Sequence, residues 1–269
     1  MRWITAVLVA IHGLIHMMGF VKAFGYAELP QLSRPISRAM GLLWFTAGLL
    51  VLASAALMVA WPRRWWMLGI LALVLSQATI ISAWHDARAG TLANVVLLLA
   101  VAYGWFTEGP LSFRTQFERD ASAGLSRAME APLVSEGDLR PLPEPVQRYL
   151  RATGVVGRPR VWNYRLRFRG RIRSAPDARW MPFEAEQQSF AEEHSRFFLM
   201  RARMFGLPVE AFHRLIDGRA TMQVKIAGAI PIVDASGDAM DRSETVTLLN
   251  DMCFLAPGTL LDPTVAWEA

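Results

Sequence analysis

Four long apolar runs in the first 106 residues constrain the fold of this chain more than any other feature. A stretch of about 20 apolar residues is long enough to cross the hydrocarbon core of a bilayer as a helix. The sequence therefore predicts that residues 1–107 form a bundle of four membrane-spanning helices. The expected spans are Trp3–Phe24, Arg38–Trp61, Trp65–Trp84 and Thr91–Phe106.

Charged residues divide the chain into two physically different halves. They make up 19% of the sequence, against about a quarter in ordinary soluble domains. They are dense only from Arg114 onward. The first half is therefore expected to be surrounded by lipid and the second half by water. The single cysteine, Cys253, excludes a disulfide within the chain.

The chain is basic, with a net charge of +5. A basic surface beside a bilayer faces anionic head groups. A nucleic-acid partner is not expected, because the sequence has no zinc-ligand spacing, no RNP-type motif and no basic recognition helix. The predicted partner is the lipid bilayer, and the sequence leaves the oligomeric state open.

Basic residues near the ends of the spans indicate the orientation in the membrane. Cytoplasmic loops carry the excess of Lys and Arg, which favours a cytoplasmic N-terminus here. An even number of spans then places the second half in the cytoplasm too, in a multi-pass protein of the inner (plasma) membrane. The first run is expected to be retained, because it is longer than the apolar core of a signal peptide. The comparison is of five residues with four: Arg2, Arg63, Arg64, Arg114 and Arg119 against Lys22, Arg34, Arg38 and Arg88.

Two histidines in the first span, His12 and His16, are the most unusual residues of the membrane half. Their spacing of four residues places them on one helix face, and ionisable residues at membrane depth are functional candidates. With Ser76, Thr79 and His85 they could form a small site for a metal, a haem, a quinone head group or a proton. In the preferred interpretation the two histidines only hydrogen-bond to neighbouring helices. No cofactor is assigned.

The end of the first span carries a resemblance to a known family. The segment His16–Gly25 reads HMMGFVKAFG and precedes three further short apolar runs. It resembles the DoxX-like family of small membrane proteins through a glycine followed by a lysine, Gly19 and Lys22. The resemblance implies a four-helix membrane bundle in the first half. Gly19 also lies where another helix could approach closely.

Residues 108–142 are expected to be an amphipathic and proline-rich linker, and residues 143–269 a β-rich domain. A helix begins at Pro143, after which the apolar period changes from helical to alternating. Asp217-Gly218 is a strong hairpin signal. Asp234–Gly237 is expected to be a turn, and Asp241 with Glu244 three residues later predicts the start of a last helix. Together these signals predict an α+β fold, an antiparallel meander with flanking helices. Its strands are expected at Tyr164–Arg173, Trp180–Phe190, Arg196–Phe205, Val209–Ile216 and Ala220–Ile226.

The first predicted strand alternates strictly, with apolar residues on one face and five arginines, from Arg165 to Arg173, on the other. A solvated face with cross-strand ion pairs to Glu184 and Glu186 is the preferred interpretation. An arginine stripe that binds lipid or nucleic acid is the alternative.

An ordered set of motifs in the second half resembles a bacterial family of uncharacterised proteins with a β-rich domain behind one or several membrane spans. The family is catalogued as a domain of unknown function, so it implies neither an activity nor catalytic residues. Its members continue past the position that matches Trp267 with further strands. The resemblance therefore predicts that this chain is truncated and its sheet incomplete. The motifs are Pro143–Gly154 (PEPVQRYLRATG), Trp180–Gln187 (WMPFEAEQ), Gly206-Leu207-Pro208, Asp217-Gly218-Arg219 and Asp234–Gly237.

No catalytic motif argues for an enzyme. The chain has no nucleophile elbow, phosphate loop or HExxH, and His194 and His213 are expected to be structural or surface residues. The preferred hypothesis is that the apolar face of the sheet binds a lipid or another apolar molecule. A metal, haem or redox protein that uses His12, His16 and His85 is the alternative, and a structural scaffold the third hypothesis. The ligand-binding candidates are Phe168, Trp180, Phe183 and Met222.

Overall fold

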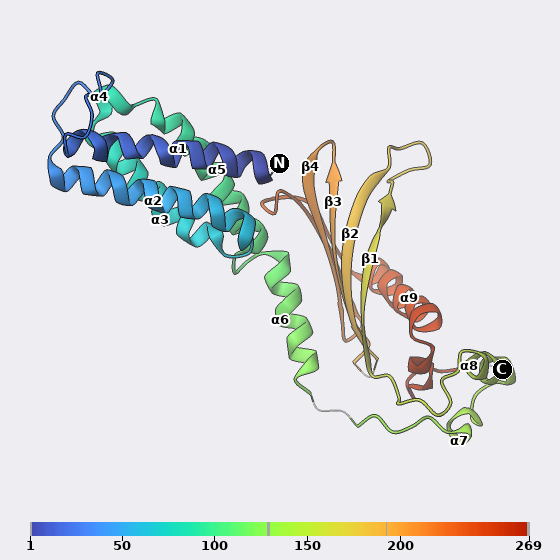
Figure 1. The fold of residues 1–269 in the computed structure, drawn as a ribbon. Helices are drawn as coiled ribbons and strands as arrows, with labels where there is room; N and C mark the ends of the chain where they lie inside the picture. The colour runs from blue at the N-terminus through green and yellow to red at the C-terminus, as the bar shows by residue number, and fades with distance from the viewer. Residues whose placement is uncertain (1, 128–129, 192, 268–269) are drawn as a thin grey trace. The chain divides into compact units, whose positions relative to one another are not determined.

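The computed structural model describes residues 2–127, 130–191 and 193–267. Two compact units divide the chain, residues 1–112 and residues 113–269. Figure 1 labels helices α1 to α9 and strands β1 to β4.

The first unit is an all-helical bundle. Among the described residues, four helices are long and apolar enough to cross a membrane, namely α1, α2, α3 and the helix that begins at Gly90. Their outward side chains, such as Leu14 and Val74, are more than half exposed in the protein alone, as expected for helices that lipid surrounds. The expected membrane bundle is confirmed. Its elements are α1 (Arg2–Ala23), α2 (Arg38–Ala60), α3 (Trp65–Ser82), the short α4 (Trp84–Ala87) and α5 (Gly90–Glu108).

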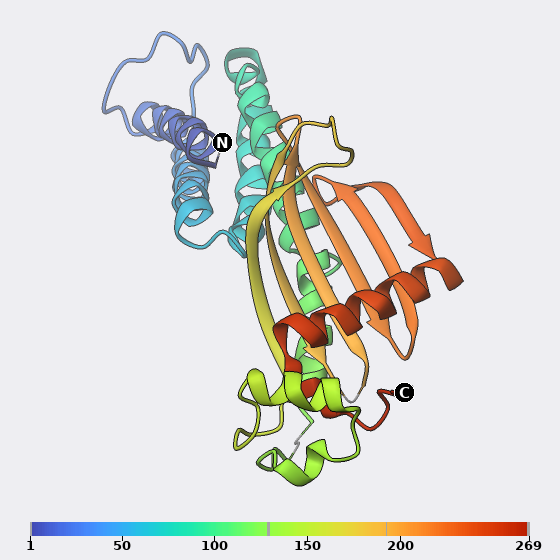
Figure 2. The same cartoon turned by 90° about the vertical axis from the view of Figure 1, so that its right-hand side faces the viewer.

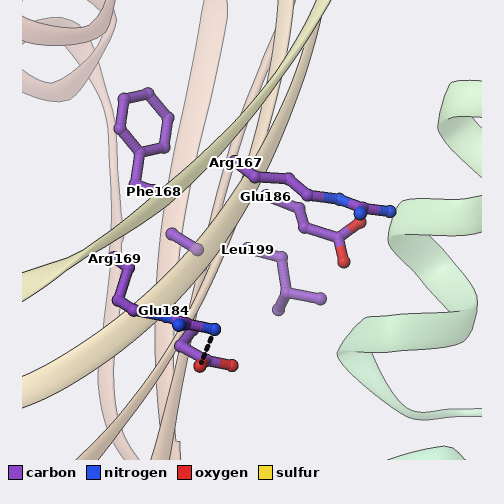
Figure 3. Close-up of a pocket in the computed structure, with 7 residues that line it drawn as sticks. Arg167, Phe168, Arg169, Glu184, Glu186 and Leu199 are labelled. Atoms are coloured by element: carbon purple, nitrogen blue, oxygen red, sulfur yellow. Dashed lines mark ion pairs between the residues drawn. The ribbon is translucent and has the colours of Figure 1, made fainter.

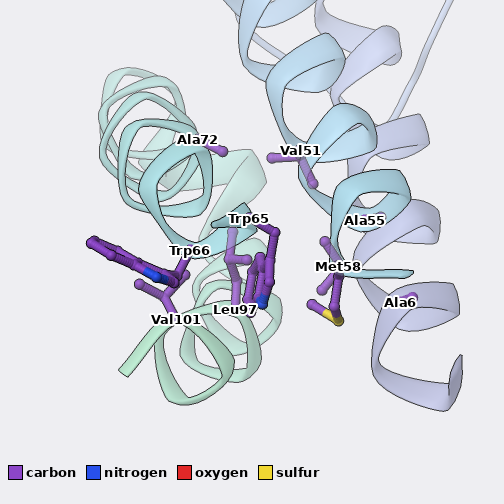
Figure 4. Close-up of a cluster of buried hydrophobic side chains, with 10 residues drawn as sticks. Ala6, Val51, Ala55, Met58, Trp65, Trp66, Ala72, Leu97 and Val101 are labelled. Atoms are coloured by element: carbon purple, nitrogen blue, oxygen red, sulfur yellow. The ribbon is translucent and has the colours of Figure 1, made fainter. Parts of the chain in front are cut away.

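Glycines let α1 and α2 pack closely. A Cβ atom at Gly19 would lie 2.3 Å from Cδ2 of Trp44, and one at Gly41 would lie 2.3 Å from Cβ of Ala23. Small residues at helix contacts are typical of membrane bundles, where packing drives association. The expected close contact at Gly19 is confirmed. Toward the opposite end of these helices, Trp65 and Trp66 pack with apolar side chains of the bundle, including Val51, Met58, Leu97 and Val101 (Figure 4).

The second unit is an α+β fold built on one open antiparallel sheet. Its six strands follow one another in the order β1-β2-β3-β4-β5-β6. This confirms the predicted meander with flanking helices. The elements are α6 (Phe113–Leu125), α7 (Glu136–Leu139), α8 (Glu144–Ala152), β1 (Asn163–Ile172), β2 (Met181–Phe190), β3 (Ser195–Met204), β4 (Leu207–Ile216), β5 (Arg219–Ile226), β6 (Ile230–Ser236), α9 (Asp238–Leu255) and the 3-10 helix η1 (Pro257–Leu261).

Two sequence predictions near β6 are wrong. Residues Asp234–Ser236, expected in a turn, form the end of β6 and pair with β5. The alternation there is obscured by Pro231 and by a register shift between Val224 and Lys225. The last helix begins at Asp238, so Asp241 does not cap it. Instead the carboxylate of Asp241 accepts a hydrogen bond of 2.6 Å from the backbone N–H of Ala220 on β5.

Helices cover opposite faces of the sheet, because alternate side chains of each strand point to opposite sides. On one face Phe113 and Phe117 of α6 pack against Phe197 and Phe212 of the sheet. On the other face α9 packs Leu248 and Met252 against the sheet. Figure 1 shows α6 and α9 on the two sides of the strands. The segment 108–142, expected as a linker, therefore contains a helix that forms one layer of this unit.

Candidate functional site

The face of the sheet that α9 covers is ordered in rows across the strands. The strand register places the side chains of the base row side by side, namely Tyr164, Ser189, Arg196, Leu215 and Ala220. The next row, here called the inner row, consists of Leu166, Gln187, Phe198, His213, Met222 and Ala235. Two further rows are formed by Phe168, Ala185, Met200, Ala211, Val224 and Val233, and by Gly170, Phe183, Ala202, Val209, Ile226 and Ile230.

The last two rows, here called the open apolar face, contain no polar side chain. Figure 2 shows α9 crossing the strands near one end, while no other described element of the second unit lies over the rest of this face. Large side chains there, such as Phe168, Phe183 and Met200, are partly exposed, whereas the small Ala185 and Ala211 between them are buried. An apolar surface of this kind marks a site for an apolar partner more often than an isolated exposed side chain does.

A buried charge cluster lies between α9 and the base and inner rows. It is defined as Arg196, Gln187 and His213 of the sheet with Glu244 and Asp251 of α9. Arg196 is the centre of the cluster, with a side chain only 7% exposed. Its Nη1 donates to Oε2 of Glu244 at 2.9 Å, its Nε to Oδ2 of Asp251 at 2.8 Å, and its Nη2 to Oε1 of Gln187 at 3.1 Å. Buried charges are stable only when they are paired and hydrogen-bonded in this way.

His213 lies at the edge of this cluster, where the inner row meets the open apolar face. Its Nδ1 is 2.7 Å from Oε1 of Glu244, and its side chain is 21% exposed. Burial acts to raise the pKa of Glu244, but the hydrogen bond from His213, together with the charge and hydrogen bond of Arg196, outweighs it and lowers that pKa. Glu244 is therefore ionised at neutral pH. A carboxylate only accepts hydrogen bonds, so Nδ1 of His213 carries the proton.

Three of the four predicted ligand-binding residues are brought to this face. Phe168 and Phe183 belong to the open apolar face, and Met222 is in the inner row opposite His213. Trp180 lies elsewhere: the guanidinium of Arg173 is 4.6 Å from the centre of its ring, and that of Arg171 is 6.0 Å away. Trp180 therefore lies beside the alternating arginines from Arg165 to Arg173, here called the arginine row.

The arginine row lies on the face that α6 covers, beside a groove of about 360 Å³ lined by Arg167, Arg169, Glu184, Glu186 and Leu199, among others (Figure 3). Arg169 pairs with Glu184 at 3.0 Å and Arg165 with Glu186 at 2.6 Å. The expected cross-strand ion pairs are confirmed. The groove is charged and its carboxylates are paired, so it is a poor site for an apolar molecule.

Glu186 also binds Arg114 of α6, at 3.0 Å. Burial acts to raise the pKa of Glu186, but hydrogen bonds from Arg165 and Arg114 outweigh it and lower that pKa to about 2. The ion pairs therefore join three elements of this face, α6, β1 and β2.

In the first unit, His12 and His16 meet Ser76 in the interior of the bundle. Nε2 of His16 lies 2.8 Å from Oγ of Ser76, and Nε2 of His12 lies 3.0 Å from Oδ1 of Asn94. Thr79 lies 3.5 Å from Nδ1 of His16. The structure thus brings together the two histidines, Ser76 and Thr79, and adds Asn94, which the sequence interpretation had not assigned to this group.

His85 is not part of that network. Its side chain is 71% exposed and its Nδ1 lies 2.9 Å from Oδ1 of the neighbouring Asp86. Among residues 2–127, 130–191 and 193–267, no group of three or more His, Cys, Asp or Glu side chains could hold a metal ion. Within the described bundle, His12 and His16 hydrogen-bond to neutral side chains such as Asn94 and Ser76. Such partners are typical of a structural hydrogen-bond network between helices.

Sequence reasoning missed the buried charge cluster. The next residue on the same strand face is Phe198 for Arg196, and it is Ala211 or Leu215 for His213, so both polar side chains stand beside apolar ones. Glu244 and Asp251 are seven residues apart on α9, which places them on one helix face. A polar residue at an inward position of an amphipathic strand is the signal that could have indicated it. The partners of each residue depend on how α9 crosses the sheet.

The second half of the chain matches a known family, over residues 132–269. The match confirms the resemblance that the sequence motifs indicated. It does not extend to the four helices before residue 132, and the DoxX-like resemblance of that part is not shown. No curated protein and no solved structure gives a significant match. Because the matched residues are more than half of the 269 in the chain, the protein belongs to the DUF6544 family, a family of unknown function.

Proposed function

We propose that this protein binds a lipid or another apolar small molecule on the open apolar face of its sheet, while its helices hold it in a membrane. The observation that carries the proposal is the pair of outer rows, which are wholly apolar and which α9 leaves free. Removing apolar surface from water stabilises a complex by about 25 cal/mol per Å². An acyl chain on these rows would gain this energy.

The arrangement of the polar groups supports an amphipathic rather than a purely hydrocarbon ligand. The charge cluster closes one end of the open apolar face, and the opposite end of the strands carries only apolar side chains on this face. Ligand sites are mostly apolar with a few positioned polar groups. We propose the inner membrane as the location, with the second unit on the cytoplasmic side, from the distribution of basic residues.

The membrane anchor favours such a function, because it keeps the sheet at a high effective concentration of lipid. A binding face that releases its ligand must not be covered permanently. The partial exposure of Phe168, Phe183 and Met200 meets that requirement.

A photolabelling experiment tests the proposal on the full-length protein. The protein is placed in lipid nanodiscs that contain a trace of phospholipid with a diazirine in its acyl chain, irradiated, digested and mapped by mass spectrometry. Labelling is expected in β1 to β5 at the open apolar face, in addition to the lipid-facing helices. Met200→Glu, which introduces a charge into the middle of this face, is expected to abolish the labelling of the sheet.

The matched control is Asn250→Glu, which adds the same carboxylate at an exposed position of α9. It is expected to leave the labelling of the sheet unchanged. Labels confined to the helices of the first unit, or sheet labelling that survives Met200→Glu, would overturn the proposal.

A further inference from the structure

His213 lies in the inner row, next to the open apolar face, and among the described residues only one of its two ring nitrogens is bound. Its Nδ1 is held by Glu244, and its ring stands edge-on to Phe198, with ring centres 5.7 Å apart and planes at 89°. Within the described part of the chain its Nε2 has no hydrogen-bond partner. Across the strands, the two neighbours of His213 are Phe198 and Met222. Nε2 is therefore an isolated polar atom at the boundary of an apolar surface.

The hydrogen bond to Glu244 determines what Nε2 can do. A neutral imidazole has one donor nitrogen and one acceptor nitrogen, and the bond made by the first determines the role of the second. Since Nδ1 donates its proton to the Glu244 carboxylate, the neutral ring has its lone pair at Nε2. A partner at that position must therefore donate a hydrogen bond.

The charges around His213 point to the same partner. Arg196 is positive, and its two partners Glu244 and Asp251 are negative, so these three side chains carry one net negative charge. At short range in a partly buried site, a second negative charge is repelled. A ligand with a carboxylate at this end is disfavoured twice, by the charge and by the lone pair of Nε2.

The open apolar face offers room for a chain that starts at His213. Successive rows on one face are two residues apart, which corresponds to roughly 7 Å along a strand. The two outer rows therefore extend roughly 14 Å beyond His213, and the neighbouring strands, each about 4.8 Å from the next, give the surface its width. A molecule with one polar end at His213 would have only apolar contacts beyond it.

We propose that the ligand of the open apolar face is a long-chain lipid alcohol whose hydroxyl group donates a hydrogen bond to Nε2 of His213. This inference rests on the proposed lipid-binding function and adds the chemistry of the head group. Glu244 is a positioning residue, which holds the imidazole in the tautomer that accepts at Nε2.

Two probes of matched chain length test the head group. Oleyl alcohol has a hydroxyl donor, whereas methyl oleate is neutral and only accepts hydrogen bonds. Each is added in increasing amounts to the full-length protein in the nanodisc assay, and the amount that halves the photolabelling of the open apolar face is determined. A neutral hydrogen bond contributes about 1 kcal/mol, so the alcohol is expected to compete about fivefold better than the ester in the wild-type protein.

His213→Phe keeps a ring of similar size and removes the acceptor. It is expected to bring the alcohol to the level of the ester and leave the ester unchanged. His85→Phe, the same substitution at an exposed site in the other unit, is expected to keep the wild-type preference. Circular dichroism verifies that the sheet is intact in each variant. The comparison of the two probes in the wild-type protein tests the inference even if a variant does not fold.

The outcomes separate the two proposals. If both probes compete equally for wild-type labelling, or the ester competes better, the lipid-alcohol inference is wrong while lipid binding stands. The same holds if the alcohol keeps its advantage in a folded His213→Phe protein. If the open apolar face is not labelled at all, both proposals are overturned.

Discussion

Nη1 of Arg196 and Oε2 of Glu244 lie 2.9 Å apart between the sheet and α9, and each side chain is only 7% exposed. The two residues are 48 positions apart in the chain. Removing one partner of a buried pair leaves the other charge in a poorly solvated place, which is much more unfavourable than losing the pair as a whole. The contact therefore couples the position of α9 to the strand that carries Arg196.

Replacing Arg196 by methionine is expected to destabilise the second unit by about 3–5 kcal/mol, because Glu244 and Asp251 lose their common partner. Guanidinium unfolding of the full chain, followed by the β-sheet circular dichroism signal, measures the change. Arg148→Met is the matched control. Arg148 pairs with Glu144 at 2.6 Å where both are well exposed, so its loss is expected to change stability by less than about 0.5 kcal/mol. Equal effects of the two substitutions would contradict the buried role of Arg196.

The ion pairs of Glu186 predict a loss of stability in acid. The pKa of Glu186 is about 2 in the folded protein against an ordinary value of 4.5. A depressed pKa contributes stability that is complete above the ordinary value and is lost as the pH falls towards the folded value. We therefore expect Glu186→Gln to be less stable than the wild type at neutral pH and to show a flatter decline between about pH 4.5 and 2.

Chemical unfolding of both proteins at a series of pH values measures this difference. Glu184→Gln provides the control, because the Glu184–Arg169 pair is exposed on both sides and such pairs contribute little. If the stability of the Glu186→Gln protein fell as steeply with decreasing pH as that of the wild type, other carboxylates would have to be responsible for the loss of stability in acid.

Gly124 of α6 lies against the ring of Phe190, where an added Cβ would come within 2.3 Å of Cζ. In an exposed helix Gly→Ala stabilises by about 1 kcal/mol. Here the close contact should reverse the sign, and Gly124→Ala is expected to destabilise the second unit by about 1–3 kcal/mol through overpacking. The neighbouring Ser122→Ala, at an exposed position of the same helix, should be neutral or slightly stabilising. Thermal unfolding of the two variants decides the matter, and a stabilising Gly124→Ala would show that α6 is not packed on the sheet in this way.

Asn94 joins three polar side chains inside the bundle. Its Oδ1 accepts hydrogen bonds from Ser76 at 2.8 Å and His12 at 3.0 Å, and its Nδ2 donates to Gln77 at 2.9 Å. Asn94→Leu removes all three bonds, each of which contributes about 0.6 kcal/mol on average in membrane bundles. We expect a lower melting temperature of the helical signal in detergent. Val95→Leu, at the exposed neighbouring position, should leave it unchanged, and a variant as stable as the wild type would show that this network does not hold the helices together.

Local patterns were sufficient for the elements that bury one regular face. The four apolar runs predicted the membrane helices because length and apolarity alone decide whether a helix can cross a bilayer. Strict alternation predicted β1, and the apolar side chains at Phe168 and Phe183 were placed on the correct face by the same rule. β6 was missed because Pro231 and the register shift beside Lys225 break its alternation.

The sequence was therefore sufficient to predict four helices that are apolar enough to span a membrane and, in the strands, which residues share a face, since both follow from the local pattern of apolar side chains. Which of the inward residues contact one another depends on the tertiary fold. His213 was expected to be an isolated histidine, yet it binds Glu244 because α9 crosses the sheet at that point. That crossing is determined by packing between segments far apart in the chain, including Leu215 against Leu248 and Met252. Such contacts leave no periodic signal in the sequence, so the polar end of the apolar face could be recognised only in the folded protein.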